Sequence, residues 1–476
     1  MIVAAMVATL TLAAQPAVTR GAESRRLDAE DLEKALYVGT LDNMDAWIME
    51  GRRHVKQVVL TDLNMEPVSI APIDGTGDMQ VLAASVDGRR TSVLLLKKTN
   101  RSTAVLRGEI DADSRALVES FDTVVVYEYG RKDECMVWAA TSPSGNYNAL
   151  VCVVQLNETK QYGSRTFLLD ARMRVVWDKE FAMGSMHEVM VTDSGRVVTL
   201  GVEREGEEAH FIFNTLDGRR EASYDAVVKC DPVKEIHLAN VVGRFAVAVG
   251  LYQPAQGRNA DKLTEGVLTM SFDLDAAVLA GITMRPFQNE DMNIFQNMKT
   301  KKIQKSQVCD HIAVLGLTPT SWGAAMALGR DMEIEKSSNG GSVTREGLGV
   351  GVNVVAVDTT GHVRWVRNIR RNDVSKENGV PKVGLATSSD GHVCVVKTES
   401  PKAPEFYDIS DEARKFTVGD KGSLVTYTID ADGKTERLLL ERKTKQTLFR
   451  TLARRDGTVL IYSLRGNKTR LAELRF

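Results

Sequence analysis

The sequence predicts an all-β fold, a β-propeller of seven or eight four-stranded antiparallel blades, with eight preferred. Three observations support this prediction. A hairpin pattern occurs eight times, a second hairpin follows most of its copies, and the units are evenly spaced. The clearest copy of the second hairpin is VVAVDTTGHVRWVRNI at 354–369. Two hairpins per unit make one blade, which predicts a ring of similar blades.

The first hairpin of each unit consists of an apolar run, a turn and a second apolar run. Three of the turns contain Asp-Gly, which strongly favours a tight hairpin between apolar strands. The candidates lie at 35–49, 79–96, 135–154, 187–202, 236–252, 311–328, 383–398 and 448–464.

The second hairpin combines an Asp, a short turn that often contains Gly, and a further strand. We expect Asp358 to accept backbone N–H groups and Gly361 to supply a positive φ. Trp365 follows at the same spacing as in Asp170…Trp177, so both tryptophans are expected to pack between blades rather than to contact a ligand. The copies lie at 58–70, 167–177, 211–224, 270–282, 354–365 and 425–440.

The two ends of the chain decide how the ring closes. The last unit, 446–476, has three strands, so a strand from the N-terminal region would complete it. The segment at 22–35 is charged, however, and favours a helix or a tail.

The N-terminal segment also indicates export. Residues 2–14 are apolar or small, so residues 1–22 are predicted to be a signal peptide or a short anchor, cleaved within 13–17. No later segment is long and apolar enough to span a membrane. Residues 35–476 are then expected to form one propeller domain in a periplasmic or secreted protein.

Three segments depart from the repeat. Residues 285–309 predict a short amphipathic helix capped by Asn289. Residues 329–350 are predicted to form a polar, Gly/Ser-rich loop, and residues 399–423 a Pro-rich and then helical insertion. The last two lie between the second and third strands of their blades, so they are expected on one face of the ring. That face, or the mouth of the central channel, is the expected working surface.

Two local patterns resemble known propeller families. Ala356-x-Asp358-x-x-Gly361-x-x-x-Trp365 resembles the docking repeat of quinoprotein-like propellers and the Asp box of sialidase-type propellers, with a one-residue difference between Asp and Gly in each case. From about 350 to 476 the chain more closely resembles uncharacterised exported propeller-like (quinoprotein/WD-repeat-like) proteins of Bacteroidetes bacteria. The segments that carry this resemblance are VVAVDTTGHVRWVRNI, LVTYTIDADGKTERLLL and GNKTRLAELRF. The resemblance implies export and a propeller-like fold, and it implies no reaction.

The sequence contains none of the common motifs for metal, phosphate or nucleophile chemistry. His-Glu-x-x-His, Cys-x-x-Cys, a Walker loop and a G-x-S-x-G elbow are all absent. We therefore assign no catalytic, cofactor-binding or metal-ligating residue and expect no cofactor. His187, His237 and His311 begin the first strands of successive units, near the expected channel, where packed or solvated histidines are favoured over a metal site.

The five cysteines are scattered and do not suggest a disulfide framework. Cys135 and Cys152 are predicted to lie roughly opposite each other on adjacent strands. A directly cross-strand disulfide is strained, so two buried thiols are the preferred interpretation. Four lysines between 299 and 305 follow the predicted helix and are interpreted as a solvated helix end.

The charge balance and the repeat together favour a binding function. A net charge of −2, from 61 Lys+Arg against 63 Asp+Glu, gives no reason to expect nucleic acid or an anionic membrane as partner. The favoured function is an exported, non-catalytic interaction module with a protein or cell-envelope partner. The alternative is a glycan-active hydrolase or lyase with carboxylates in the channel, because such pairs come from different blades and leave no local motif. A quinone enzyme is the least favoured.

Overall fold

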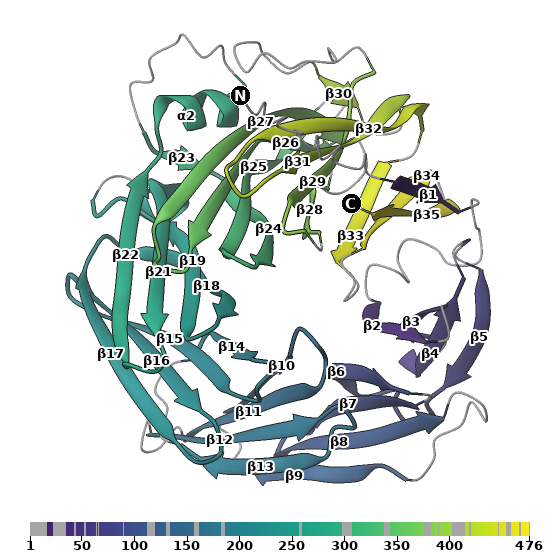
Figure 1. Cartoon of the computed structure of the whole chain (residues 1–476), viewed down its shortest axis with the longest axis vertical. Coiled ribbons are helices and arrows are strands. Elements are labelled where there is room, and N and C mark those ends of the chain that lie inside the picture. Colours follow the sequence, from purple (N-terminus) through teal and green to yellow (C-terminus); the bar gives the residue numbers. More distant parts are fainter. Residues whose placement is uncertain are drawn as a thin grey trace, which may run out of the picture.

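The computed structural model contains eight antiparallel sheets arranged as a ring (Figure 1). We number these blades 1 to 8 in chain order, starting with the sheet that contains β2. This is the eight-bladed β-propeller that the sequence predicts. The structure describes residues 17–21, 35–297 and 307–475, with gaps at 42–43, 52–53, 63, 65, 89, 112–119, 130–133, 157–160, 182–185, 257–258, 338–342, 376–381, 389, 402–414, 418–419, 446, 454–457 and 466–467.

The inner half of each blade is a hairpin, and all eight predicted copies are confirmed. The innermost strands are β2 (Leu36–Leu41), β6 (Gln80–Asp87), β10 (Glu134–Thr141), β14 (Glu188–Val191), β18 (Val233–Val242), β24 (Ile312–Thr320), β28 (Gly384–Thr387) and β33 (Thr447–Ala453). Their hairpin partners are β3 (Met44–Glu50), β7 (Arg90–Lys98), β11 (Tyr147–Leu156), β15 (Val197–Glu205), β19 (Phe245–Tyr252), β25 (Gly323–Ser337), β29 (Val393–Glu399) and β34 (Val459–Arg465).

In the outer halves of the blades, the six predicted second hairpins are confirmed, and blade 2 contains a seventh. The third strands are β4 (Lys56–Thr61), β8 (Ser102–Asp111), β12 (Gln161–Asp170), β16 (Glu208–Leu216), β21 (Gly266–Asp273), β26 (Val343–Asp358), β31 (Gly422–Ile429) and β35 (Lys468–Arg475). The outermost strands are β5 (Pro67–Pro72), β9 (Asp122–Glu128), β13 (Val175–Glu180), β17 (Glu221–Lys229), β22 (Val278–Pro286), β27 (Val363–Ser375), β32 (Thr435–Thr444) and, in blade 8, β1 (Ala17–Arg20).

The outer turns have the predicted chemistry. Asp358 accepts the backbone N–H groups of Thr360 and His362 at 2.8 and 3.1 Å, and Gly361 has φ +81°. Trp365 packs on Gly433 in the outer turn of the next blade, and its indole N–H donates to the Ala431 carbonyl at 3.1 Å.

The equivalent Trp177 packs on Gly218, whose Cβ, if present, would lie 2.7 Å from the indole ring. Both tryptophans therefore join one blade to the next, as expected.

Apolar side chains fill every interface between neighbouring blades. For example, Val198 and Phe213 of blade 4 pack with Met270 and Phe272 of blade 5. Blades 8 and 1 pack in the same way, with the rings of Trp47 and Tyr462 5.3 Å apart. The ring is thus closed by side-chain packing as well as by strand pairing.

The N-terminal strand β1 closes the last blade. It pairs antiparallel with β35, with Ala17 opposite Arg475 and Arg20 opposite Ala472. This pairing confirms the expectation that a strand from the N-terminal region completes the last blade, because the unpaired edge of β35 offers it backbone hydrogen bonds. The helix or tail expected at 22–35 falls almost entirely on 22–34, outside the described residues. β1 lies within the predicted signal segment 1–22. Cleavage before Val18 would leave most of it in the mature protein.

The insertions gather at one end of the ring, which we call the insertion face. Each innermost strand begins there, each second strand ends there, and each third strand begins there. The helix α2 (Asn289–Phe295) precedes blade 6 at this end. Its N-cap is Gln288, one residue before the predicted Asn289, because the Asp291 carboxylate accepts the Gln288 N–H at 2.9 Å. The lysines at 299–305 lie outside the described residues.

The other two insertions also lie at this face, between second and third strands as predicted. Most of 329–350 is not a loop, because β25 extends to Ser337 and β26 begins at Val343. Of 399–423, the part that the structure describes includes β30 (Phe416–Thr417), which pairs parallel with β27 of blade 6. The predicted helical part falls on 402–414, outside the described residues. The two-stranded sheet of β20 (Leu263–Thr264) and β23 (Cys309–Asp310) lies beside a 3-10 helix, η2 (Ala260–Lys262).

The register separates the two cysteines that were predicted to face each other. Cys135 lies opposite Val154, and Cys152 lies opposite Val137, so the two thiols are diagonal neighbours. Diagonal pairs lie about 7–8 Å apart, beyond the reach of a disulfide. Both thiols are free and buried, as preferred from the sequence.

Candidate functional site: a pocket between blades 4 and 5

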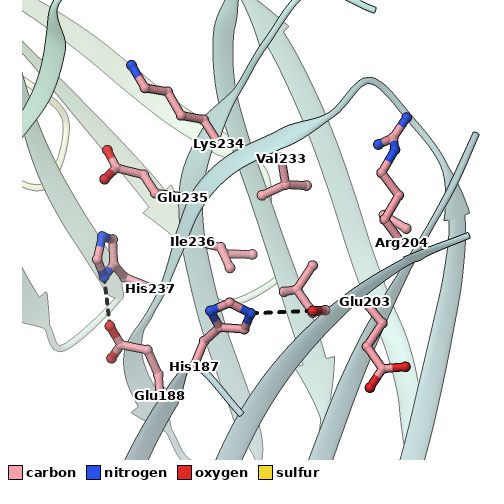
Figure 2. Close-up of a pocket in the computed structure, with 11 residues that line it drawn as sticks. His187, Glu188, Glu203, Arg204, Val233, Lys234, Glu235, Ile236 and His237 are labelled. Carbon is pink, nitrogen blue, oxygen red and sulfur yellow. Dashed lines mark hydrogen bonds and ion pairs between the residues drawn. The ribbon is translucent and has the colours of Figure 1, made fainter. Parts of the chain in front are cut away.

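A pocket of about 430 Å³ opens on the insertion face between blades 4 and 5. The innermost strands β14 and β18 form one side of it, and the end of β15 with the start of β16 forms the other (Figure 2). Its lining residues are His187, Glu188, Val202, Glu203, Arg204, Ala209, Val233, Lys234, Glu235, Ile236 and His237.

A histidine–carboxylate pair joins the two blades at the inner side of the pocket. His237 Nδ1 lies 2.7 Å from Glu188 Oε1, and each side chain is 32% exposed. This hydrogen bond raises the pKa of His237 against the opposing effect of burial, and the charge of nearby Glu235 adds to the increase. His237 therefore carries a proton over a wider pH range than an ordinary histidine.

The middle of the pocket combines an imidazole with an apolar wall. His187 Nε2 lies 3.3 Å from the Val202 carbonyl oxygen. Ile236 and Ala209 are buried, and Val202 and Val233 are partly exposed. Figure 2 shows His187 and Ile236 between Glu235 on one side and Arg204 on the other.

The two cationic side chains of the lining are held by other groups. Lys234 Nζ donates to Thr264 Oγ1 at 3.0 Å and to the Ile312 carbonyl at 3.3 Å. Arg204 donates to the Gly206 and Cys230 carbonyls. By contrast, the side chain of Glu235 forms no hydrogen bond or ion pair with any residue that the structure describes, although its charge acts on His237. The pocket thus keeps a carboxylate available to a ligand.

A second pocket, of about 510 Å³, lies at the equivalent place between blades 1 and 2. Met49, Met79 and Leu82 contribute apolar surface to it, and Glu50 and Lys56 are its charged residues. Lys56 Nζ lies 2.8 Å from Glu50, and His54 contacts the other carboxylate oxygen. The bonds from Lys56 and His54 lower the pKa of Glu50 to about 2.

A group of charged side chains that is mostly buried lies in blade 6, on its long strands β25 and β27. Arg371 is fully buried and pairs with Asp331 at 2.7 Å and with Asp373 at 3.1 Å. A Cβ at Gly349 would lie 2.2 Å from the Arg371 guanidinium, so only glycine leaves room for it. Burial raises the pKa of both aspartates. Arg371 and Asp373 are enclosed and Asp331 is 22% exposed, and the Arg371–Asp331 ion pair joins strands β25 and β27 of this blade.

The histidines that the sequence places near the channel are only partly brought together. His187 and His237 line the same pocket, whereas His311 lies beside Asp310, with Nε2 3.8 Å from its carboxylate. Among the residues that the structure describes, no three His, Cys, Asp or Glu side chains are arranged to hold a metal ion. The described part of the chain also contains no helix with the length and apolar character needed to cross a bilayer.

Sequence reasoning assigned no site residue and missed the glutamates of this pocket. The sequence does contain a signal for this site. His187-Glu188 and Glu235-x-His237 place glutamates beside histidines at the starts of the innermost strands of blades 4 and 5. Finding it requires knowing that these strand starts are neighbours, which follows only from the blade assembly.

Comparisons with known proteins assign no family to the chain. The chain matches no protein-family model and no curated protein. Among solved structures, the WD40 domain of SCAP from fission yeast is 10% identical, with 97% of this chain and 94% of that one covered and a TM-score of 0.40. The Nup133 β-propeller domain of Vanderwaltozyma polyspora is 9% identical, with 98% and 99% covered and a TM-score of 0.40.

An acylaminoacyl peptidase from Pyrococcus horikoshii is 11% identical, with 92% of this chain but 59% of that one covered and a TM-score of 0.36. Because these identities and TM-scores are low, the architecture is assigned from the sheet topology of the chain itself. The chain is an eight-bladed β-propeller with an open, partly acidic pocket on its insertion face.

Proposed function

We propose that the protein is an exported, non-catalytic binding module that holds a protein or cell-envelope partner on its insertion face. The observation that carries this proposal is the concentration of features at one end of the ring. The helix α2, the extended hairpin of blade 6, the described part of the blade 7 insertion with β30, and both pockets all lie there. In a propeller, loops on a rigid scaffold are where binding surfaces vary.

The rigidity of the scaffold favours binding without rearrangement. Each interblade interface is packed with apolar side chains, and the Trp177 and Trp365 contacts tie neighbouring blades together. A preorganised surface loses less conformational entropy when it binds. A partner that covers about 800 Å² of each surface would span several blades of this face.

The test is partner capture from periplasmic and membrane fractions of the source cells. The tagged wild type is compared with a variant in which 402–414 is replaced by a Gly/Ser linker, and with the pocket variant Glu235→Arg. Asp432→Arg, in the β31–β32 turn at the opposite end, is the matched control, because its side chain is 91% exposed.

A stoichiometric partner recovered by wild type and Asp432→Arg, and lost with either insertion-face variant, supports the proposal. Recovery of free monomer alone, or equal capture by all four proteins, contradicts it. Cell fractionation tests export separately, since an exported protein is found outside the cytoplasm with the N-terminal segment removed.

A glycan-active hydrolase or lyase is the second candidate, and the Glu188–His237 pair beside Glu235 favours it. Glycosidases commonly use two carboxylates, one of which has a raised pKa. Incubation with envelope polysaccharides should then release reducing or unsaturated ends, and Glu188→Gln and Glu235→Gln should each abolish the release. Absence of cleavage by protein that still captures its partner would remove this candidate.

A further inference from the structure

We propose that the pocket between blades 4 and 5 binds a lysine or arginine side chain presented by the partner. The aliphatic stem would lie against Val202, Val233 and Ile236, and the cationic head would meet Glu235 and Glu188. This inference rests on the proposed binding function and names the chemical class that this part of the insertion face selects.

The shape of the pocket suits a long side chain together with part of its backbone. Its volume of about 430 Å³ lies at the lower end of the range for ligand pockets, about 300–1,000 Å³. The apolar wall is continuous with a charged rim, which matches a residue with an apolar stem and a polar head. A short acidic side chain has no long stem to cover that wall.

The charges of the pocket favour a cation over an anion. The charges of Lys234 and Arg204 are partly compensated by backbone carbonyls and Thr264, which accept hydrogen bonds from them, so the least compensated charge of the pocket is negative. Glu235 lacks a hydrogen-bond or ion-pair partner among the described residues and lies on the same strand as His237. A ligand cation would give this carboxylate a direct ion-pair partner, which no residue in the described part of the chain provides.

The groups around His237 add a pH dependence to this binding. Glu188 from β14 and Glu235 from β18 face the imidazole, with Lys234 on the same strand and His187 across the pocket. When His237 is protonated, its charge competes with the ligand cation for the same carboxylates. Basic ligands should therefore bind more tightly as the pH rises and His237 loses its proton.

The experiment uses blocked tripeptides with the purified full-length protein. The probes are acetyl-Ala-Arg-Ala-amide and acetyl-Ala-Lys-Ala-amide, with citrulline and norleucine as their neutral counterparts and Glu as the acidic one. Affinity is measured by NMR titration at pH 8.0 and pH 6.0. We expect the Arg and Lys peptides to bind at least tenfold more tightly than their neutral counterparts, and more tightly at pH 8.0.

Point variants locate the site. Glu235→Gln should weaken the Arg peptide about tenfold and leave the norleucine peptide unaffected. The matched control Glu128→Gln removes an exposed carboxylate on the outer strand of blade 2 and should change nothing. His237→Gln should remove the difference between pH 6.0 and pH 8.0, and circular dichroism confirms that each variant is folded.

Four outcomes would overturn the inference. They are no binding of any peptide at millimolar concentration, equal binding of citrulline and Arg peptides, preference for the Glu peptide, and an unchanged affinity in Glu235→Gln. If one of these occurs while partner capture still depends on 402–414, the ligand class is wrong and the binding face stands. If capture fails as well, the proposed function itself is wrong.

Discussion

The pockets between blades 1 and 2 and between blades 4 and 5 occupy equivalent positions but differ in how their carboxylates are satisfied. In the first, Lys56 and His54 both contact Glu50. In the second, Glu235 has no hydrogen-bond or ion-pair partner among the described residues, and the nearby cations are bonded elsewhere. The repeat produces the same hollow twice. In the first pocket the one carboxylate is bound by two basic side chains, whereas in the second Glu188 pairs with His237 and the carboxylate of Glu235 keeps no direct partner among the described residues.

The largest effect is expected from removing the cation in the blade 1–2 pocket. The side chain of Lys56 is 11% exposed, so Lys56→Met leaves Glu50 partly buried without its main partner. We expect a loss of about 1–3 kcal/mol in the free energy of unfolding, measured by chemical denaturation at pH 7. Lys97→Met, which breaks a more exposed pair with Asp78 at 3.6 Å, should cost less than about 0.5 kcal/mol. Equal losses in the two variants would show that the pocket pair has no special role.

A smaller effect is expected from acid, again in the blade 1–2 pocket. Because the pKa of Glu50 is lowered from 4.5 to about 2, its ionised form stabilises the folded protein above pH 4.5. That contribution should be lost as the pH falls from 4.5 to about 2. In Glu50→Gln, the free energy of unfolding should fall less steeply over this range. Parallel curves for wild type and variant would contradict the assignment.

The Glu188–His237 pair should show the opposite pH dependence with a smaller amplitude. The pKa of His237 is raised in the folded protein, so the pair stabilises it fully below the unfolded value of about 6.5. The contribution should be lost as the pH rises through the higher folded value. Since both side chains are about one-third exposed, we expect less than about 1 kcal/mol. Denaturation curves of wild type and His237→Gln should therefore converge at high pH.

The smallest effect on stability is expected at Glu235. Because this carboxylate lacks a hydrogen-bond or ion-pair partner among the described residues, Glu235→Gln should change the free energy of unfolding by less than about 0.5 kcal/mol. The same substitution should change the affinity for basic peptides. A large destabilisation would indicate a structural role and would remove the contrast between the two pockets.

The blade architecture could be predicted because its signals are local. Asp358, Gly361 and Trp365 act within one hairpin and its neighbour, and the Asp side chain caps its own turn. Blade closure was harder to predict, because β1 is only four residues long and its partner β35 lies far away in the sequence. The polar residues of 329–350 predict a loop, whereas the structure pairs the long strands β25 and β26 over much of this range.

The candidate site could not be predicted in the same way. Glu188 and His237 are 49 residues apart in sequence, and their contact depends on the register of two strands in different blades. Whether Glu235 has an ion-pair partner depends on the direction of the Lys234 side chain. That direction is set by Thr264 and by the Ile312 carbonyl on neighbouring strands, which accept the hydrogen bonds of Lys234. Such relations follow from tertiary packing rather than from spacing.

The closing strand β1 makes the stability of the ring depend on both ends of the chain. Val18 and its neighbours are synthesised before every other described strand and their partner β35 after them, so blade 8 is completed only when the strands of the other seven blades have been made. Bringing together ends this far apart has an entropic cost that local hairpins avoid. A chain shortened at either end loses the same strand pair and leaves an edge open to proteases or to pairing with another chain. The β1–β35 pair therefore couples the first described strand of the ring to the last.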